Sequence, residues 1–182
     1  MKIFALYTNL TLYQKPTWFD EFRVQYDEPC ELHITLIQPR FIEEGDIPAL
    51  KELVSAFFAK MPISAHKIDV TFGEVSVKSG LGAIMLVAKD GGTLARLQKN
   101  LRTLLSAYRT YTDPLTQSYE ENFEPHVTIG KNLSEDRYQE ALRILKGDVI
   151  CVGIVDEIVF PIVRQTTLEE ACNPANQTRY RL

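Results

Sequence analysis

ELHITLIQP, residues 31–39, combines the composition of a buried β-strand with two polar side chains. The aliphatic residues predict a strand over 31–37, and the proline predicts a loop from Pro39 to Asp46. Because side chains two positions apart point to the same face of a strand, His33 and Thr35 share one face. Their aliphatic neighbours point to the other face, where they can pack against helices. The polar face therefore needs an explanation other than packing.

The same pattern returns in EPHVTIGKN, residues 124–132. The order histidine, aliphatic, threonine, aliphatic occurs at 33–36 and again at 126–129, and two of the three histidines in the chain open it. A single histidine in an apolar strand is usually a core residue whose nitrogens are hydrogen-bonded, but the duplication favours a functional pair. Each motif is followed by a loop, an amphipathic helix and an aliphatic strand. We interpret the chain as two related half-units that each supply one histidine and one threonine.

The other segments alternate between strand and helix patterns. Strands are expected at 2–9, 66–77, 83–89, 125–131 and 152–163, with a last strand in TRYRL at 178–182. Helices are expected at 16–23, 47–61, 94–108 and 134–146, and the polar segment 110–124 is expected to be a loop. This organisation predicts a single domain that spans residues 1–182.

Composition and charge set limits on the function classes. Of the 182 residues, 45% are hydrophobic and 24% are charged, as in ordinary globular domains. A net charge of −4 argues against a protein that coats long nucleic acid, but it is compatible with a nucleotide or a single RNA end as ligand. No segment reaches the length of a membrane span, and the N-terminal MKIFALYTNLTLYQK reads as a strand, so we expect a cytoplasmic protein with no membrane partner. The three cysteines, Cys30, Cys151 and Cys172, predict no disulfide framework.

The two motifs together predict a site for a tetrahedral phosphodiester. If the two polar faces confront each other across a groove, the groove holds two imidazoles and two hydroxyls. At neutral pH one imidazole can accept a proton while the other donates one. The hydroxyls can donate hydrogen bonds to phosphoryl oxygens. Such a site needs no metal, and a metal site that adds the third histidine, His66, is disfavoured because no acidic residue or cysteine has ligand spacing beside the motifs.

The paired H-x-T-x motifs resemble those of the two-histidine (2H) phosphoesterase superfamily, which includes 2'-5' RNA ligase-like proteins and RNA 2',3'-cyclic phosphodiesterases. The resemblance implies a bilobal α+β fold in which two antiparallel β-sheets, related by a pseudo-two-fold axis, line a central cleft with helices packed outside. It implies cofactor-free, metal-independent chemistry at a phosphodiester that involves a ribose 2'-oxygen. His33 and His126 would be the acid–base pair, and Thr35 and Thr128 would bind phosphate. Which histidine is the base stays open.

Five further residues are candidate contacts of the substrate or the cleft. Arg40 and Lys131 follow the two motifs and could bring positive charge to the cleft mouth, although the sequence favours a solvated surface charge for each. Tyr119 and Phe123 precede the second motif and could stack on a base, or could anchor their loop to the core. Strand parity places Thr8 on the cleft face.

Two alternatives share the same predicted site. The groove could bind a nucleotide or an RNA end without turnover, or the protein could be a 2'-5' RNA ligase that runs the chemistry in reverse. The loss of one histidine would separate a binder from an enzyme, because a binder would lose only some affinity. No obligate protein partner is evident in the sequence, and a monomer is expected.

Overall fold

The computed structural model describes residues 1–27, 30–61, 67–78, 82–145 and 149–182. The third histidine, His66, lies outside these ranges. Within them, the strands are β1 (Lys2–Gln14), β2 (His33–Ile42), β3 (Ile68–Lys78), β4 (Ala83–Lys89), β5 (His126–Gly130), β6 (Cys151–Val163) and β7 (Gln177–Arg181). The α-helices are α1 (Phe19–Tyr26), α2 (Ile47–Ala59), α3 (Thr93–Leu104), α4 (Leu115–Glu121), α5 (Glu135–Ile144) and α6 (Leu168–Ala171), with 3-10 turns at Glu44–Asp46 and Pro174–Asn176.

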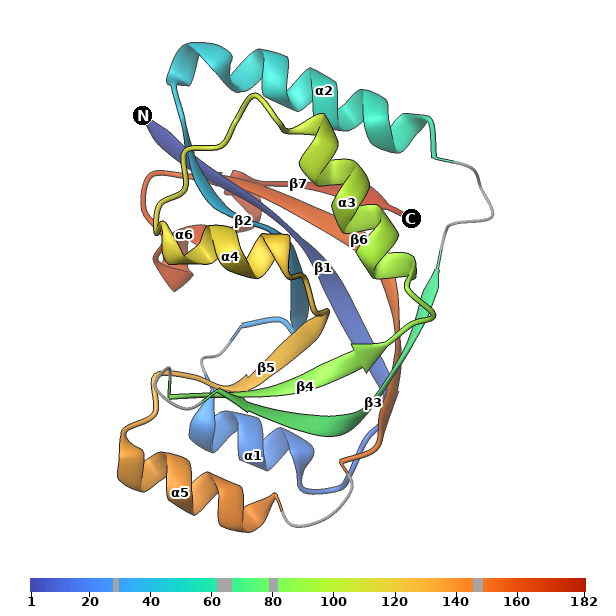
Figure 1. Ribbon diagram of the computed structural model, residues 1–182, viewed down its shortest axis with the longest axis vertical. Coiled ribbons are helices and arrows are strands. Elements are labelled where there is room, and N and C mark those ends of the chain that lie inside the picture. The colour runs from blue at the N-terminus through green and yellow to red at the C-terminus, as the bar shows by residue number, and fades with distance from the viewer. Residues whose placement is uncertain (28–29, 62–66, 79–81, 146–148) are drawn as a thin grey trace.

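The strands form one antiparallel sheet in the order β2-β1-β6-β3-β4-β5, and β7 is also paired with β6 (Figure 1). The long strand β6 joins the two halves of the sheet, because its first part pairs with β3 and its later part pairs with β7. The edge strands of the main order, β2 and β5, contact each other, so the sheet curls back on itself. The α+β class with antiparallel strands is confirmed, and the curl brings together the two strands that carry the motifs.

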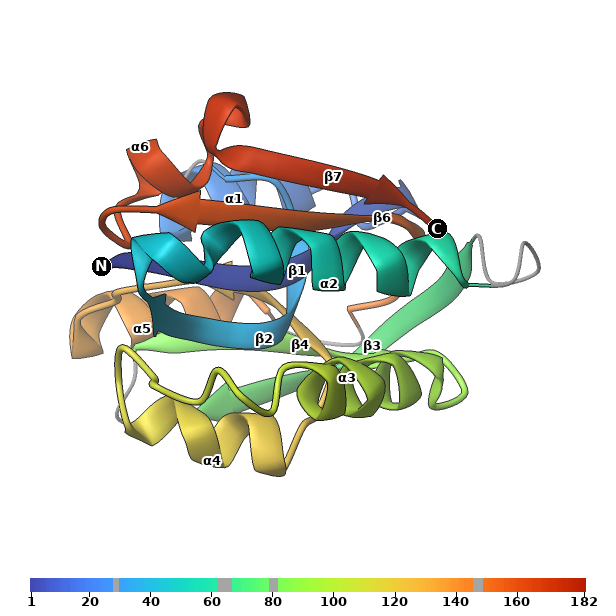
Figure 2. The same ribbon diagram turned by 90° about the horizontal axis from the view of Figure 1, so that it is seen from above.

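The helices cover the outside of the curled sheet. Helix α1 packs against β5 and α5, whereas α3 and α4 lie beside β2 (Figures 1 and 2). Each motif strand is followed by a helix and then by another strand: β2, α2 and β3 in one half, and β5, α5 and β6 in the other. The division into two related half-units stays a prediction. Within the described part of the chain, no helix is long and apolar enough to span a membrane.

The faces of the motif strands that point away from the histidines belong to the hydrophobic core. Ile34 and Leu36 of β2 and Val127 and Ile129 of β5 are each at most 1% exposed. Complete burial of an aliphatic side chain of this size stabilises the fold by about 1.5–3 kcal/mol. These residues therefore fix the register of both strands, because a slip by one residue would turn the polar motif faces into the core.

The loop predicted from Pro39 to Asp46 is wrong over its first four residues, because β2 continues to Ile42. Pro39 is accommodated for two reasons. It lies on the edge strand, where a missing N–H is tolerated, and in an irregularity of the pairing with β1 between Ile37 and Arg40. Its carbonyl accepts a hydrogen bond from the backbone N–H of Thr112 at 3.0 Å. The strand is thus extended by contacts with a distant segment.

The predicted loop at 110–124 is also wrong in part, because it contains α4. Asp113 and Pro114 start this helix instead of a simple turn. The carboxylate of Asp113 accepts a hydrogen bond from the backbone N–H of Leu115 at 2.9 Å, and Pro114 occupies the N-cap position with helical dihedral angles. The last predicted strand is confirmed as β7.

Candidate active site

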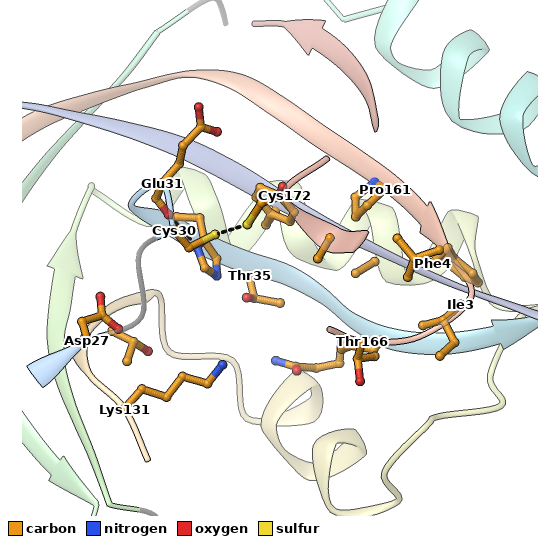
Figure 3. A pocket seen from close by; sticks show the side chains of 18 of the residues that line it. Ile3, Phe4, Asp27, Cys30, Glu31, Thr35, Lys131, Pro161, Thr166 and Cys172 are labelled. Carbon is orange, nitrogen blue, oxygen red and sulfur yellow. Dashed lines mark hydrogen bonds between the residues drawn. The ribbon is translucent and has the colours of Figure 1, made fainter. Parts of the chain in front are cut away.

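A pocket of about 480 Å³ lies between the two motif strands. Its polar lining includes His33 and Thr35 of β2, Thr128 of β5, Lys131 directly after β5, Tyr7 of β1 and Gln38. Figure 3 shows Thr35 near the middle of the pocket and the Lys131 side chain extending into it. The structure thus gathers the phosphate-binding candidates of both motifs around one cavity.

The two motif histidines are held by the same local contact. Nδ1 of His33 is 2.9 Å from the carbonyl oxygen of Glu31, and Nδ1 of His126 is 2.8 Å from the carbonyl oxygen of Glu124. A carbonyl can only accept a hydrogen bond, so Nδ1 must carry the proton in both rings. In the neutral state the basic lone pair is then on Nε2 of each imidazole. This is the nitrogen that would exchange a proton with a substrate.

The alternation predicted for the motif strands is observed. The four motif residues are half-buried, whereas the aliphatic residues between them are buried. Thr35 lies opposite Tyr7 of β1, and Thr128 lies opposite Met85 of β4. Of the four described motif side chains, only His126 is outside the lining of the pocket. It lies two positions before Thr128 on the same face of β5.

Thr8 does not face the cleft. It is fully buried, and its hydroxyl accepts a hydrogen bond from the backbone N–H of Ile34 at 3.2 Å. Its neighbour Tyr7 lies on the pocket side, where its ring centroid is 5.0 Å from that of His33. The predicted parity of β1 was wrong by one residue, because only the register with β2 decides which face of β1 is polar. Burial raises the pKa of Tyr7 well above its usual range, so it is a neutral neighbour of His33 at physiological pH.

Arg40 has a structural role that replaces the predicted contact with substrate. It is 1% exposed and forms an ion pair with Glu120 of α4 at 2.5 Å. Its guanidinium also donates hydrogen bonds to the carbonyl oxygens of Leu105 and Tyr108 at 3.2 and 2.6 Å. Through these contacts, Arg40 joins β2 to the segments around α3 and α4.

Lys131 and the two aromatic candidates lie in different environments. Lys131 is exposed and lines the pocket, and its contact with substrate stays a prediction. Phe123 packs against the hydrophobic core, which favours the anchoring interpretation. Tyr119 belongs to α4 and is 37% exposed, and neither aromatic residue is among the described residues that line the pocket. A contact between Tyr119 and a base stays a prediction.

The environment of His33 changes its basicity. Burial, the strongest influence, lowers its pKa. Hydrogen bonds with Cys30 and with the Glu31 carbonyl, together with the charges of Cys30 and Asp27, raise it, and the net result is a pKa above the ordinary value. The protonated form of His33 therefore persists to a higher pH than in a solvated histidine, which suits a group that donates a proton near neutral pH.

This effect predicts a measurable titration. We expect the imidazole of His33 to titrate above the usual histidine pKa of about 6.5. Cys30→Ala should move the midpoint downwards, because it removes contributions that raise the pKa. An NMR titration of the imidazole resonances measures both midpoints, with Cys151→Ala as the control because Cys151 is buried elsewhere, in β6. A midpoint that Cys30→Ala leaves unchanged would contradict the role given to the thiol.

Sequence reasoning missed two features of the site. Tyr7 could have been found from its strand pairing with Thr35, but that register is not visible in the sequence. Cys30 and Cys172 both line the pocket although they are 142 residues apart, and no spacing signal links them. Among the described residues, no group of three or more histidine, cysteine, aspartate or glutamate side chains is placed to hold a metal ion.

Comparisons with known proteins agree with this architecture. The family described as the 2'-5' RNA ligase superfamily matches residues 14–160. A protein of Halalkalibacterium halodurans named "Putative phosphoesterase BH1439" is 28% identical over 133 residues, which cover 70% of this chain and 69% of that protein. The crystal structure of Escherichia coli LigT in complex with 3'-AMP matches all of this chain and 95% of LigT, with a TM-score of 0.55 and 13% identity.

A crystal structure of a second protein, described as a phosphoesterase, matches all of this chain and 96% of that protein, with a TM-score of 0.54 and 14% identity. At this level of identity the two solved structures establish the fold, and the family match establishes the relationship. The chain therefore belongs to the 2'-5' RNA ligase superfamily of two-histidine phosphoesterases and has a LigT-like fold.

Proposed function

We propose that the protein is a metal-independent phosphoesterase that acts on a phosphodiester involving a ribose 2'-oxygen, in a nucleotide or at an RNA end. The observation that carries this proposal is the matched anchoring of His33 and His126. Each ring is held through Nδ1 by the carbonyl two residues before it, at 2.9 and 2.8 Å. Both imidazoles are therefore prepared to transfer a proton through Nε2, one as acid and one as base.

For a 2',3'-cyclic phosphate, the proposed reaction is hydrolysis of one ester bond. One histidine accepts a proton from water as the water oxygen bonds to phosphorus. The other histidine donates a proton to the ribose oxygen as its bond to phosphorus breaks, and the product is a phosphomonoester. Thr35 and Thr128 donate hydrogen bonds to the non-bridging oxygens, and the ammonium of Lys131 adds positive charge to the pocket.

The dimensions of the pocket support a nucleotide as the ligand class. A volume of about 480 Å³ is within the range of roughly 300–1,000 Å³ typical of small-molecule sites. LigT, which shares the fold, was crystallised with the nucleotide 3'-AMP. A nucleotide phosphate is proposed to lie between Thr35 and Thr128, and Tyr119 on α4 stays a proposed contact of the base.

The test is a phosphorus NMR time course with nucleoside 2',3'-cyclic phosphates and a 2'-5'-linked dinucleotide, in the presence of a chelator. We expect conversion to a single phosphomonoester isomer at a rate that the chelator does not change. Loss of turnover in chelator would contradict the metal-independent mechanism. The absence of turnover on both substrates, together with tight binding of a product nucleotide, would favour the binding module instead.

The two threonines give a second prediction for the same reaction. Thr35→Val and Thr128→Val keep the shape of the side chain but remove the hydroxyl donor to the phosphoryl group. Each is expected to lower kcat/KM by roughly 10–100-fold, because a hydrogen bond to a charged group contributes about 1.5–3 kcal/mol. The control is Thr71→Val on β3. The Thr71 hydroxyl donates a hydrogen bond to the Lys89 carbonyl oxygen at a distance of 3.4 Å, and Thr71 does not line the pocket. Equal kcat/KM for both motif variants and the control would exclude the phosphate-binding role.

A further inference from the structure

Cys30 and Cys172 form a sulfur pair in the wall of the pocket. Their Sγ atoms are 2.6 Å apart, although the residues are separated by 142 positions in the chain (Figure 3). Both are free, half-buried cysteines that line the pocket together with His33 and Thr35. Cys30 lies three residues before His33, at the entry to β2, and Cys172 directly follows α6. The curled sheet therefore places two thiols from opposite ends of the chain beside the proposed catalytic histidine.

We propose that Cys30 and Cys172 are a redox modification site, at which a peroxide-class oxidant forms a reversible disulfide that lowers turnover in the adjacent catalytic pocket. The geometry of the pair carries this proposal. A disulfide bond is about 2.05 Å long, so the two sulfurs need to approach by only roughly half an ångström. Partial exposure of both residues gives a small oxidant access to them.

His33 supplies the chemistry that makes one of the thiols reactive. It lines the same pocket wall as Cys30, so its imidazole is a nearby base that can accept the thiol proton. The Cys30 thiolate attacks one oxygen of hydrogen peroxide, and the O–O bond breaks to give Cys30 sulfenic acid and, with one proton, water. The sulfur of Cys172 then attacks the sulfenic sulfur, the S–O bond breaks, and a second water leaves with the thiol proton of Cys172. Two thiols are oxidised by two electrons and one peroxide is reduced to two waters.

Cys151 provides the internal comparison. It is fully buried on β6, where burial raises the pKa of its thiol to about 11. Its neutral thiol has neither the access nor the basic partner that Cys30 has. We therefore expect peroxide to oxidise the pocket pair selectively and to leave Cys151 as a thiol.

The disulfide would change the site in two ways. It would tie the segment that leads into β2 to the segment after α6, and it would remove the Cys30 thiol, whose presence raises the pKa of His33. The second change rests on the proposed function, since it alters a histidine that we assign to proton transfer. Because His33 loses a neighbour that raises its pKa, the oxidised enzyme should turn over substrate more slowly.

The modification is tested on the full chain without any assay of activity. Reduced protein is treated with hydrogen peroxide, alkylated under denaturing conditions, digested without reductant and mapped by mass spectrometry. We expect a peptide that joins Cys30 to Cys172, one alkylated Cys151, and reversal by dithiothreitol. The oxidised protein should also show a Tm raised by roughly 5–10 °C, because the cross-link closes a long loop in the unfolded chain. Two independently alkylated pocket thiols after oxidation would overturn the proposal.

Variants separate this inference from the proposed function. Cys30→Ser and Cys172→Ser should each abolish the cross-link, whereas Cys151→Ser should leave it intact. If wild type turns over a cyclic phosphate, peroxide should lower the rate in wild type and in Cys151→Ser, whereas the rate of Cys30→Ser should be the same before and after peroxide. A mapped disulfide with unchanged turnover would overturn the link to catalysis. If no substrate is turned over, the proposed function fails while the peptide map still decides whether the disulfide forms.

Discussion

His33→Ala and His126→Ala are each expected to lower turnover of a 2',3'-cyclic phosphate by roughly 10²–10⁴-fold, because each removes one partner of the acid–base pair. The double variant should be only slightly slower than the worse single variant, since both histidines serve one reaction and their effects are not additive. Single-turnover rates followed by phosphorus NMR or product chromatography measure these differences.

Binding and folding measurements complete this test. Both rings lie on the polar faces of β2 and β5 and are half-buried, so their loss should leave the melting temperature close to that of wild type. Affinity for a product monophosphate, measured by calorimetry, should fall far less than the rate. A variant that keeps wild-type turnover would remove its histidine from the mechanism. If both variants lose affinity and the wild type has no turnover, the groove is a binding module.

Loss of the buried ion pair between Arg40 and Glu120 is expected to have the largest effect on stability. The two side chains are 2% and 1% exposed. The Glu120 carboxylate also accepts hydrogen bonds from the backbone N–H of Gln38 at 2.6 Å and from the hydroxyl of Tyr111 at 3.0 Å. Removing one partner leaves an uncompensated buried charge, so Glu120→Ala or Arg40→Ala should lower the free energy of unfolding by about 3–5 kcal/mol.

Urea unfolding followed by circular dichroism measures this loss, and the adjacent Glu121→Ala is the matched control. Glu121 is on the same helix, but its side chain is 48% exposed and its ion pair with Arg102 is long, at 4.0 Å. Its removal should therefore change the free energy of unfolding by less than about 1 kcal/mol. If Glu120→Ala and Glu121→Ala are equally stable, the ion pair does not hold α4 to β2. The same Glu120 carboxylate accepts a hydrogen bond from the backbone N–H of Gln38, which lines the pocket, so α4 also helps to position this part of β2.

The motif residues could be predicted because their signal is local. The alternation of side chains along a strand follows from backbone geometry, so the common face of His33 and Thr35, and of His126 and Thr128, is contained in the sequence. The buried aliphatic residues between them confirm it. The α+β class was predictable for the same reason, since strand and helix periods can be read over short windows. The helix α4 was missed because Asp113-Pro114 is compatible with both a turn and a helix start.

The sequence by itself determined the paired motifs, the polar faces that carry them and the family to which they belong. Only the tertiary structure decided that β2 and β5, the edges of one sheet, curl into contact and that Tyr7 rather than Thr8 faces the cleft. It alone paired Arg40 with Glu120 across 80 positions and Cys30 with Cys172 across 142. The physical reason is that strand register, sheet curvature and long-range side-chain pairs depend on the packing of the whole chain. Local patterns record only which face of each strand is apolar.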